Sequence, residues 1–380
     1  MRPKLLYLVT EDWYFCSHRL PIARAARDAG FEVVVVTRVR AHMEQLRDER
    51  FRVIPLEFRR GRFAPLSDLG VLRKLVQCYR RERPDLVHHV ALKPVIYGSL
   101  ASRYAGVTNV VNALGGLGYV FTSRSAKARL LRPLVRGGLR RLLGARGSWL
   151  VVQNPDDYQQ LVERAGAVAE RSLIIRGSGV DVRYFRPWGE PSGPVVVASM
   201  VGRMLWDKGV GDLVEAARLL KERGCAVRVV LVGPPDPENP ASIPVAQITE
   251  WVRHGWVEWC GQRTDIGEVW RQSHLAILPS YREGLPKALL EAAACGRPIV
   301  TTDTPGCREI VRDGENGILV PPRDPGALAE AIERLAGDPA LRARMGACGR
   351  RMVEAEFSEE HVVEQTLGLY RSVLGGYWPS

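Results

Sequence analysis

Two carboxylates, Glu283 and Glu291, flank the predicted start of a helix, and their spacing could serve one extended ligand. The helix follows a buried strand that ends at Leu278, and Pro286 stands at the predicted first helical position, where its missing N–H removes no hydrogen bond. A helix N-terminus carries unpaired amides and a partial positive charge, so it suits a phosphate or a sugar hydroxyl. The amides expected there are those of Gly284, Leu285 and Lys287.

Each of the two glutamates also has a purely structural interpretation. A carboxylate at a helix start, such as Glu283, is stabilised by the helix dipole and needs no ligand. Glu291 falls about five residues into the helix, roughly 7 to 8 Å along its axis, and its leucine and alanine neighbours argue against an exposed position. Because two acceptor-only carboxylates at that separation could bind two hydroxyl pairs of one ligand, we interpret the two residues together.

Two cations, Arg203 and Lys208, follow the first predicted strand of the second half of the chain and lie between Gly202 and Gly209. Glycines let a backbone approach a ligand closely, and an arginine with a lysine can neutralise a diphosphate. Cations after strands are also common on ordinary protein surfaces, so the pair alone is a weak motif. The sequence has no Asp-x-Asp spacing and no His/Cys/Asp cluster typical of metal sites. We therefore predict activity without a metal or another cofactor.

Short runs of Val, Ile and Leu alternate with helix-length segments twice along the chain. This alternation is typical of βαβ units whose parallel strands are covered on both faces. The first series consists of Leu5 to Val9, Val33 to Val36, Val53 to Pro55, Leu86 to His89, Asn109 to Asn112 and Leu150 to Val152. The second consists of Val195 to Val201, Val227 to Val232, Val257 to Trp259, Leu275 to Leu278, Ile299 to Thr302 and Ile318 to Val320. We predict an α/β fold of two doubly wound, Rossmann-like domains that face a central cleft.

A proline- and glycine-rich segment from Arg183 to Pro194 separates the two series and is typical of a linker. We predict a first domain over residues 1–186, a second over residues 195–360, and a C-terminal helix over residues 361–380. A chain of 380 residues exceeds the usual size of one hydrophobic core, which favours two domains.

The chain has a formal net charge of +12, and its basic residues are clustered. No Asp or Glu occurs from Leu86 to Pro155, whereas arginines are frequent from Arg124 to Arg146. Leucines recur on one side of a predicted helix from Ala126 to Leu143, a basic amphipathic pattern typical of helices on anionic membrane surfaces. The alternative is a core-facing helix with a solvated arginine face. Because leucines rather than aromatics lie between the arginines, we expect no nucleic-acid binding.

No apolar run approaches the roughly 20 residues needed to cross a bilayer, and the first apolar segment is too short for a signal peptide. We therefore expect a cytoplasmic protein that lies peripherally on the inner face of the plasma membrane. The seven cysteines are scattered and never spaced as metal-ligand pairs, so we expect reduced thiols.

With Arg203, Lys208, Glu283 and Glu291 in this order, the second half resembles the retaining glycosyltransferases of family 4, which have the GT-B fold. Further matching turns are Val232-Gly233, Leu278-Pro279-Ser280, Thr302-Asp303-Thr304-Pro305-Gly306 and Asp313-Gly314-Glu315-Asn316-Gly317. The resemblance implies that Arg203 and Lys208 hold the diphosphate of a UDP-sugar donor. It implies that Glu283 holds the transferred sugar and that Glu291 holds the ribose.

The resemblance also implies the remaining parts of the donor site and of the catalytic step. Gly284, Leu285 and Pro286 would line the donor site beside Glu283. In the family the departing phosphate helps to take the acceptor proton, so no dedicated base is required. Catalysis would then rest on Arg203, Lys208 and Glu283, which position the donor and stabilise the leaving group.

The first half resembles the subset of that family that extends polyprenyl-diphosphate-linked glycans, such as undecaprenyl-diphosphate saccharides, in bacterial envelope pathways. Some members of this subset transfer N-acetylgalactosamine. The matching segments are Ser17-His18-Arg19-Leu20-Pro21, His89 through Lys93-Pro94 to Gly98, and Gly116-Leu117-Gly118-Tyr119. The resemblance implies that the first domain binds the acceptor and that the C-terminal helix returns to it. The implied acceptor contacts are His18, Arg19, Lys93 and Gly118.

The first half departs from the common family pattern at two turns. Glu11-Asp12-Trp13 stands where many members carry a Gly-Gly turn, and Asn112-Ala113-Leu114 stands where many carry a histidine. No catalytic histidine is therefore assigned. We predict a retaining hexosyl- or N-acetylhexosaminyltransferase that acts from a UDP-sugar on a polyprenyl-diphosphate-linked saccharide in bacterial surface glycan synthesis. The alternatives are a nucleotide-sugar epimerase of the same fold and a non-catalytic membrane scaffold.

Overall fold

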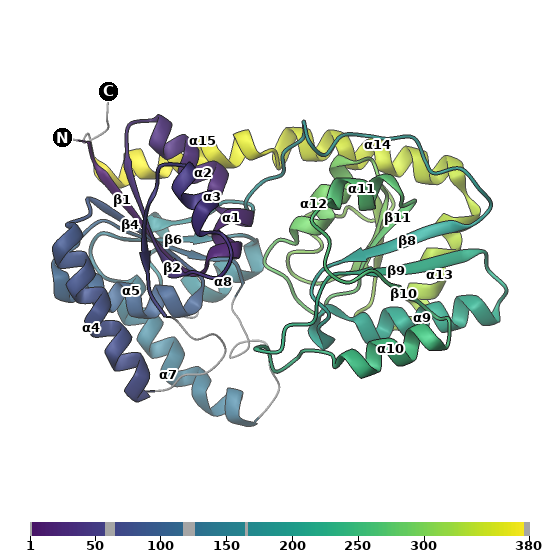
Figure 1. Cartoon of the computed structure of the whole chain (residues 1–380), viewed down its shortest axis with the longest axis horizontal. Helices are drawn as coiled ribbons and strands as arrows, with labels where there is room; N and C mark the ends of the chain where they lie inside the picture. The colour runs from purple at the N-terminus through teal and green to yellow at the C-terminus, as the bar shows by residue number, and fades with distance from the viewer. Residues whose placement is uncertain (1, 58–64, 117–125, 164–165, 376–380) are drawn as a thin grey trace. The chain divides into compact units, whose positions relative to one another are not determined.

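The computed structural model describes the 380-residue chain except residues 1, 58–64, 117–125, 164–165 and 376–380 (Figure 1). The chain forms two compact units, Met1–Ser178 with Glu360–Ser380, and Gly179–Glu359. The predicted first domain extended to residue 186, but Val180 and Phe185 are buried in the core of the second unit. Val180 also forms a β-bridge with Ser358, so the chain enters and leaves the second unit at paired segments.

The first unit is built on a seven-stranded parallel sheet of order β3-β2-β1-β4-β5-β6-β7. Its strands are β1 Lys4–Glu11, β2 Glu32–Arg38, β3 Arg52–Pro55, β4 Leu86–Val90, β5 Val110–Leu114, β6 Ser148–Val152 and β7 Ser172–Ile174. Its helices are α1 Asp12–His18, α2 Leu20–Asp28, α3 Met43–Asp48, α4 Pro65–Glu82, α5 Leu92–Ala105, α7 Ala126–Leu143, α8 Pro155–Val162, the 3-10 helix η1 Ala169–Arg171 and α15 Glu359–Leu374.

The strands of this sheet are covered on both faces, because successive side chains point to opposite sides. In β1, Tyr7 and Val9 belong to a cluster that includes Tyr370 of α15, whereas Leu6 and Leu8 belong to a cluster that includes Leu75 of α4. This double burial explains why the strands appear in the sequence as continuous apolar runs.

The second unit is built on a six-stranded parallel sheet of order β10-β9-β8-β11-β12-β13. Its strands are β8 Val196–Val201, β9 Val227–Val232, β10 Glu258–Trp259, β11 Leu275–Leu278, β12 Ile299–Thr302 and β13 Gly317–Val320. Its helices are the 3-10 helix η2 Trp206–Lys208, α9 Val210–Glu222, α10 Val245–Arg253, α11 Ile266–Arg271, α12 Lys287–Ala294, α13 Pro325–Gly337 and α14 Pro339–Glu356.

Strand order in the second unit creates a place for a ligand. The chain runs from β8 outward through β9 and β10, and then returns to the other side of β8 with β11. In doubly wound folds, ligands bind outside the carboxyl ends of the strands where the order reverses. That point lies between the ends of β8 and β11, which lead to Arg203 and to Glu283.

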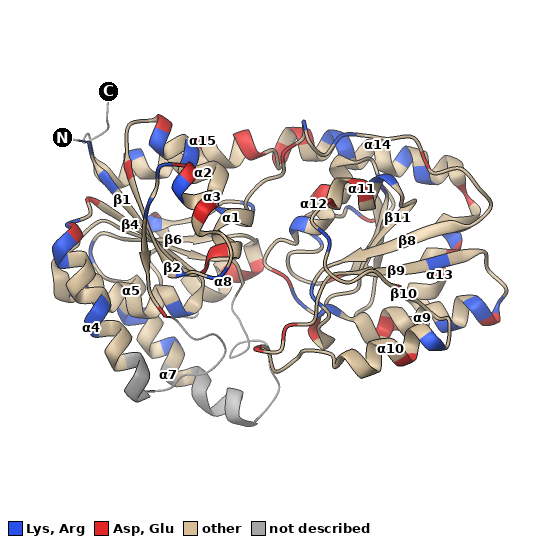
Figure 2. Ribbon diagram, viewed as in Figure 1, with Lys and Arg blue, Asp and Glu red and all other residues tan. Residues whose placement is uncertain are grey.

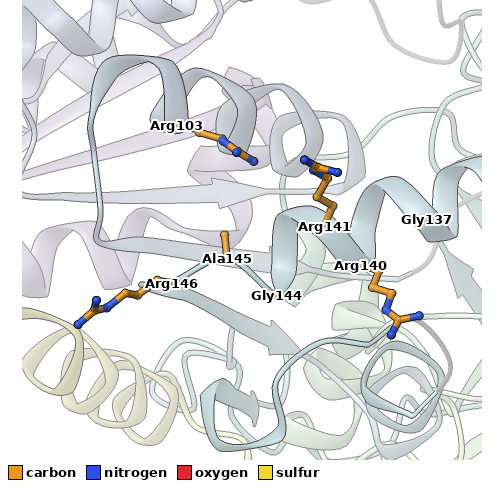
Figure 3. Close-up of a pocket in the computed structure, with 7 residues that line it drawn as sticks. All are labelled: Arg103, Gly137, Arg140, Arg141, Gly144, Ala145 and Arg146. Carbon is orange, nitrogen blue, oxygen red and sulfur yellow. The ribbon is translucent and has the colours of Figure 1, made fainter.

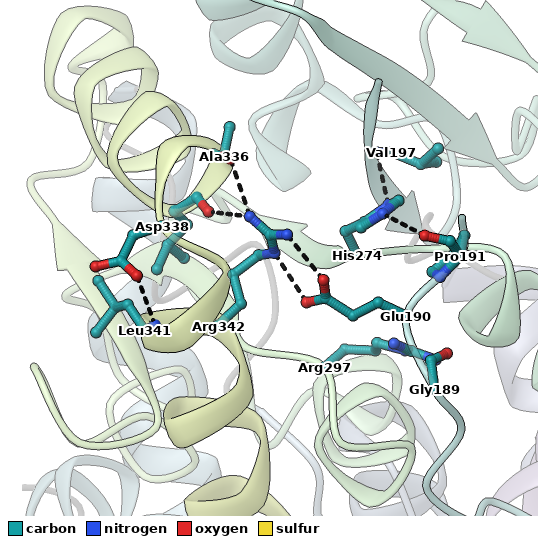
Figure 4. A network of polar contacts seen from close by, with 11 residues as sticks. Gly189, Glu190, Pro191, Val197, His274, Arg297, Ala336, Asp338, Leu341 and Arg342 are labelled. Carbon is teal, nitrogen blue, oxygen red and sulfur yellow. Dashed lines mark hydrogen bonds and ion pairs between the residues drawn. The ribbon is translucent and has the colours of Figure 1, made fainter. Parts of the chain in front are cut away.

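The linker before β8 is held against the second unit by polar contacts (Figure 4). Nε and Nη2 of Arg342 each donate to a carboxylate oxygen of Glu190 at 2.8 Å. Nδ1 of His274 accepts the backbone N–H of Val197 at 3.0 Å, so its Nε2 carries the proton and donates to the carbonyl oxygen of Pro191 at 3.1 Å. Burial lowers the pKa of His274, in agreement with the neutral tautomer that these bonds require.

Candidate functional site

The centre of the site is an ion pair between Lys208 and Glu283, which lie 75 residues apart in the chain. Nζ of Lys208 donates to Oε1 of Glu283 at 2.5 Å, and Oγ of Ser280 donates to the same oxygen at 2.6 Å. The two charged side chains are 21% and 12% exposed, so water still reaches the pair. A ligand at the carboxyl edge of the sheet can therefore meet both charges.

Gly209 brings Lys208 to this edge. Its φ is +70°, and a Cβ at this position would lie 2.0 Å from the carbonyl oxygen of Pro279 at the end of β11. Only a glycine permits that approach, because it has no side chain and adopts positive φ without strain. The turn after β8 therefore packs directly on the turn after β11, and the backbone N–H of Tyr281 donates to the carbonyl oxygen of Asp207 at 3.0 Å.

Arg203 has a carboxylate partner that the sequence analysis did not identify. Its Nη1 donates to Oδ2 of Asp236 at 2.5 Å, and the arginine side chain is 33% exposed. Asp236 follows β9, and Gly233 at the end of that strand would place a Cβ only 1.9 Å from the carbonyl oxygen of Gly202. The only signal in the sequence was the position of Asp236 just after a predicted strand.

The loop that carries Glu283 rests on the turn after β12. The backbone N–H of Glu283 donates to the carbonyl oxygen of Pro305 at 3.1 Å, and Oγ1 of Thr304 donates to the carbonyl oxygen of Ser280 at 3.2 Å. Gly306 has a φ of +83°, and a Cβ there would lie 2.6 Å from the carbonyl oxygen of Gly284. These contacts hold the loop that positions the carboxylate of Glu283.

Helix α12 begins one residue later than predicted. Pro286 is the N-cap residue, with φ −74° and ψ 107°, and the helix starts at Lys287. The expectation that Pro286 is the first helical residue was therefore wrong, because its ψ lies in the extended region. No side chain caps the helix, and Gly284, Leu285 and Pro286 are buried beside its N-terminus. Gly296, with φ +71°, follows the C-cap as expected.

Glu291 lies half-buried on α12. Burial raises the pKa of its carboxyl to about 7, and the charge of Glu359 adds to the rise, while the charge of Lys287 and the indole of Trp270 oppose it. Nε1 of Trp270 is fully enclosed and forms no hydrogen bond of normal geometry with the described residues. Near neutral pH the carboxyl of Glu291 is therefore protonated in part of the molecules, and ligand hydroxyls that donate to it would favour the ionised form.

The first unit holds three of the four predicted acceptor residues at the carboxyl edge of its sheet. The ring of His18 at the end of α1 stacks on Tyr14, with centroids 4.2 Å apart and planes 5° apart. Arg19, between α1 and α2, is 5% exposed, and its guanidinium forms no hydrogen bond or ion pair with the part of the chain that the structure describes. Nζ of Lys93, in the first turn of α5, lies 5.8 Å from the ring centroid of Tyr97. Gly118 lies outside the described residues.

Asp12 is the first residue of α1, directly after β1. Its Oδ2 accepts the backbone N–H groups of Arg40, Ala41 and His42 at 2.7 to 2.9 Å, and its Oδ1 accepts that of Trp13 at 2.8 Å. Burial alone would raise the pKa of Asp12, but these four hydrogen bonds outweigh it and hold the pKa below the ordinary value. Asp12 therefore fixes the turn structurally.

Four arginines surround a hollow of about 660 Å³ on the first unit (Figure 3). Arg103 comes from α5, and Arg140, Arg141 and Arg146 come from the end of α7 and the turn after it. Arg103 and Arg141 point toward one another, and no carboxylate pairs with any of the four among the described residues. Figure 2 shows further basic residues along α4 and α7. Of the predicted basic face, Arg124 lies outside the described residues.

The described residues lack two features, a metal-binding cluster and a membrane-spanning helix. No group of three His, Cys, Asp or Glu side chains lies close enough together to hold a metal ion. No helix in that part of the chain is long and apolar enough to span a bilayer.

Comparisons with known proteins match both units. The family model described as Glycosyl transferase 4-like matches residues 4–143, and the one described as Glycosyl transferases group 1 matches residues 195–338. The N,N'-diacetylbacillosaminyl-diphospho-undecaprenol alpha-1,3-N-acetylgalactosaminyltransferase of Campylobacter jejuni is 28% identical over 370 residues, covering 94% of this chain and 95% of the relative. The capsular polysaccharide biosynthesis glycosyltransferase CapM of Staphylococcus aureus is 23% identical over 387 residues, covering 98% and 97%. HepE of Anabaena in complex with UDP and glucose superposes with a TM-score of 0.76 at 22% identity, covering 97% of this chain and 100% of that one.

Proposed function

The chain belongs to the group 1 and 4-like glycosyltransferases, and we propose that it transfers an N-acetylhexosamine, with retention, from a UDP-sugar to a polyprenyl-diphosphate-linked saccharide in bacterial surface glycan synthesis. The predicted GT-B fold and the predicted glycosyltransferase activity are both confirmed. The relative from Campylobacter jejuni is named for an undecaprenol-diphosphate acceptor and an N-acetylgalactosamine donor sugar, which supports the proposed substrates.

The Lys208–Glu283 pair is the observation that carries the proposal. When a UDP-sugar enters, the ammonium of Lys208 leaves Glu283 and binds the donor diphosphate. The guanidinium of Arg203 likewise leaves Asp236 and binds the diphosphate. Glu283 then keeps the hydrogen bond from Ser280 and accepts hydroxyl groups of the transferred sugar. Two cations would thus stabilise the UDP leaving group while the sugar is held beside them.

The reaction needs no base from the protein. The bond between the anomeric carbon and the β-phosphate oxygen breaks, the acceptor hydroxyl oxygen bonds to the same face of the sugar, and the departing phosphate takes the hydroxyl proton. Because positive charge at Arg203 and Lys208 favours the separated phosphate, these residues act mainly on the transition state. The proposal retains the prediction that activity needs no metal, and unchanged turnover in EDTA would agree with it.

Glu291 is suited to the ribose of the donor. A ribose presents two neighbouring hydroxyl groups, and a carboxylate can accept a hydrogen bond from each. Burial raises the pKa of this carboxyl to about 7 without a ligand, so two donated hydrogen bonds would bring it to the ionised form on binding.

The acceptor is proposed to bind the first unit. Arg19 is only 5% exposed, and no anionic group among the described residues pairs with it. Burying an unpaired charge costs free energy, and a ligand that supplies an anion would offset this cost. The diphosphate of a polyprenyl-linked saccharide would supply it, with Lys93 and His18 nearby along the same sheet edge. The four arginines around the hollow of Figure 3 suit the anionic membrane surface in which this lipid lies.

A panel of UDP-sugars tests the proposal, with undecaprenyl-diphosphate saccharides as acceptors and with released UDP and product mass as the readouts. We expect lipid-linked product from the wild-type chain and at least a hundredfold lower turnover for Glu283→Ala, because an interaction with the transferred sugar is lost. Glu330→Ala, an exposed glutamate on α13, is the matched control and should retain activity.

Other outcomes of the same panel identify the alternatives. Isomerised UDP-sugar without an acceptor would indicate an epimerase. Binding of UDP-sugar with no product from any acceptor would indicate a non-catalytic scaffold. Equal turnover of Glu283→Ala and the wild type would overturn the donor-site assignment.

A further inference from the structure

An unpartnered polar side chain lies at the carboxyl edge of the first sheet, apart from the charged acceptor candidates. Gln153 follows β6 and is 6% exposed, yet its amide forms no hydrogen bond with the described residues. A side-chain amide offers two donors and an acceptor, and buried amides of this kind are almost always hydrogen-bonded. The amide atoms of Gln153 are not fully enclosed, so the amide keeps access to solvent.

The strand register explains what the amide faces. Leu114 of β5 pairs with Val152 of β6, so Gly115 and Gln153 leave the sheet side by side. A Cβ built on Gly115 would lie 3.4 Å from both Nε2 and Oε1 of Gln153 and 3.2 Å from the hydroxyl oxygen of Tyr14. Three segments of the chain thus place a phenol and an amide around a position that carries no side chain. The φ of Gly115 is not in the left-handed region, so backbone conformation alone does not require a glycine here.

These groups have the chemistry of a sugar subsite. The phenol of Tyr14 and the amide of Gln153 are neutral, and each can both donate and accept, as can each hydroxyl of a sugar. A phosphate would require cations, and neither side chain is one. The ring of Tyr14 is stacked on His18, and Arg19 is the next residue, so the neutral groups adjoin the segment proposed to hold a diphosphate.

We propose that Tyr14, Gly115 and Gln153 form the subsite for the sugar residue of the acceptor that adjoins its diphosphate. Because Gly115 has no side chain, Gln153 and Tyr14 approach its backbone closely and present their polar groups together, and these groups hydrogen-bond the hydroxyl or acetamido groups of the sugar. This proposal rests on the proposed acceptor role of the first unit. It adds residues that select the acceptor saccharide, while Arg19 contacts its charge.

Binding of two short-chain lipids to the full chain tests the proposal. The probes are farnesyl diphosphate and farnesyl-diphosphate-linked N-acetylhexosamine, titrated calorimetrically onto wild type, Gln153→Ala and Gly115→Ala. We expect the wild type to bind the sugar-bearing lipid about tenfold more tightly than farnesyl diphosphate, as one or two hydrogen bonds would give. Both variants should lose that gain and bind farnesyl diphosphate as the wild type does. Gly115→Ala is informative because its methyl group would push against Tyr14 and Gln153 and displace them without removing a polar group.

Controls separate this proposal from the donor site and from misfolding. Gln159→Ala removes an exposed glutamine from α8 and should keep the full sugar-dependent gain. UDP binding to the second unit should be equal in the wild type and the three variants. A variant that loses UDP binding and has a changed melting temperature has a folding defect. A sugar-dependent gain that persists in both variants, or that is missing in the wild type, would overturn the subsite. If instead the wild type showed no turnover with any UDP-sugar of the panel, the proposed function would be overturned.

Discussion

Charged side chains of the proposed donor site are paired with one another in the structure. Nζ of Lys208 lies 2.5 Å from Oε1 of Glu283. Nη1 of Arg203 lies 2.5 Å from Oδ2 of Asp236. Partly exposed pairs of this kind contribute little to stability, so they can be exchanged for a ligand at small cost. In the proposed mechanism Lys208 is already oriented for the diphosphate, because Gly209 fixes its turn on Pro279 and Ser280 holds its partner Glu283.

Glu291 gives a pH-dependent prediction at the residue scale. Its pKa is about 7 in the folded chain against an ordinary value of 4.5, so the folded state binds more protons between these values and stability falls as pH rises through them. The loss is at most about 3 kcal/mol, at about 1.4 kcal/mol for each pKa unit. We expect Glu291→Gln to be more stable than the wild type at pH 8 and little different at pH 5, as measured by urea unfolding.

The control for this experiment is Glu330→Gln, which changes an exposed glutamate of α13. Its unfolding curves should follow those of the wild type at both pH values. If Glu291→Gln and the wild type lost the same stability between pH 5 and pH 8, the raised pKa of Glu291 would be refuted. Weaker UDP binding by Glu291→Gln at pH 8 would further support its role at the ribose.

At the scale of elements, the site depends on close backbone contacts between turns that follow parallel strands. The turn after β8 packs on the turn after β11 through Gly209, and the turn after β12 packs on the Glu283 loop through Gly306. Each contact is short enough to exclude a Cβ. The carboxyl ends of three neighbouring strands are thereby locked to one another around Lys208 and Glu283.

Gly209→Ala is expected to separate the turn that carries Lys208 from the end of β11. The new Cβ would meet the carbonyl oxygen of Pro279 at 2.0 Å, so the backbone must shift, in addition to the roughly 1 kcal/mol cost of positive φ for alanine. We expect at least a tenfold loss of turnover per unit of folded protein and a lower urea midpoint. Both are measured with the donor that the panel of UDP-sugars identifies.

Gly224→Ala is the matched control for that variant. Gly224 has a φ of +72° and no atom within 4 Å of a built Cβ, so its substitution carries the conformational cost alone. Its urea midpoint should fall, whereas its turnover should stay at the wild-type value. Equal turnover of Gly209→Ala and Gly224→Ala would show that the close contact with Pro279 does not position Lys208.

At the scale of the whole molecule, charge is distributed unevenly. The net charge is +12, and Arg103 and Arg141 face one another across a hollow in the first unit without a described carboxylate partner. Like charges held together without a partner repel, and this arrangement is favourable only where anions are abundant. An anionic lipid surface fulfils that condition.

We expect charge reversal at Arg103 and Arg141 to weaken binding to vesicles that contain phosphatidylglycerol. The double variant Arg103→Glu/Arg141→Glu should bind at least about thirtyfold more weakly at low salt, because each basic residue near the surface contributes roughly 1 kcal/mol and each new glutamate is repelled. Vesicle sedimentation measures the effect, and higher salt should reduce the difference from the wild type.

The control carries the same change in net charge elsewhere. Arg334→Glu/Arg344→Glu reverses two exposed arginines on α13 and α14 of the second unit and should bind vesicles almost as the wild type does. Equal weakening by both double variants would show that only net charge matters. No weakening by either would argue against an interaction of the first unit with the membrane.

The sequence alone determined the class of fold, most of the strands and which charged residues are proposed for the donor site. Strands covered on both faces must be apolar throughout, so they stand out as short Val, Ile and Leu runs, and the chemistry of Arg203, Lys208, Glu283 and Glu291 depends on residue type. Strand β7, Ser172–Ile174, was missed because it is short and only half-buried. Helix α12 was placed one residue too early, since proline is common at both the N-cap and the first helical position.

Only the tertiary structure decided which residues meet. Asp236 beside Arg203, Lys208 beside Glu283, and Gln153 beside Gly115 come from turns that follow different strands, and strand order is what joins them. A parallel sheet with crossover connections places the carboxyl ends of distant segments at one edge, and local sequence patterns carry no information about that order. Burial, likewise a property of the whole fold, raises the pKa of Glu291 and leaves Arg19 and Gln153 without a described partner.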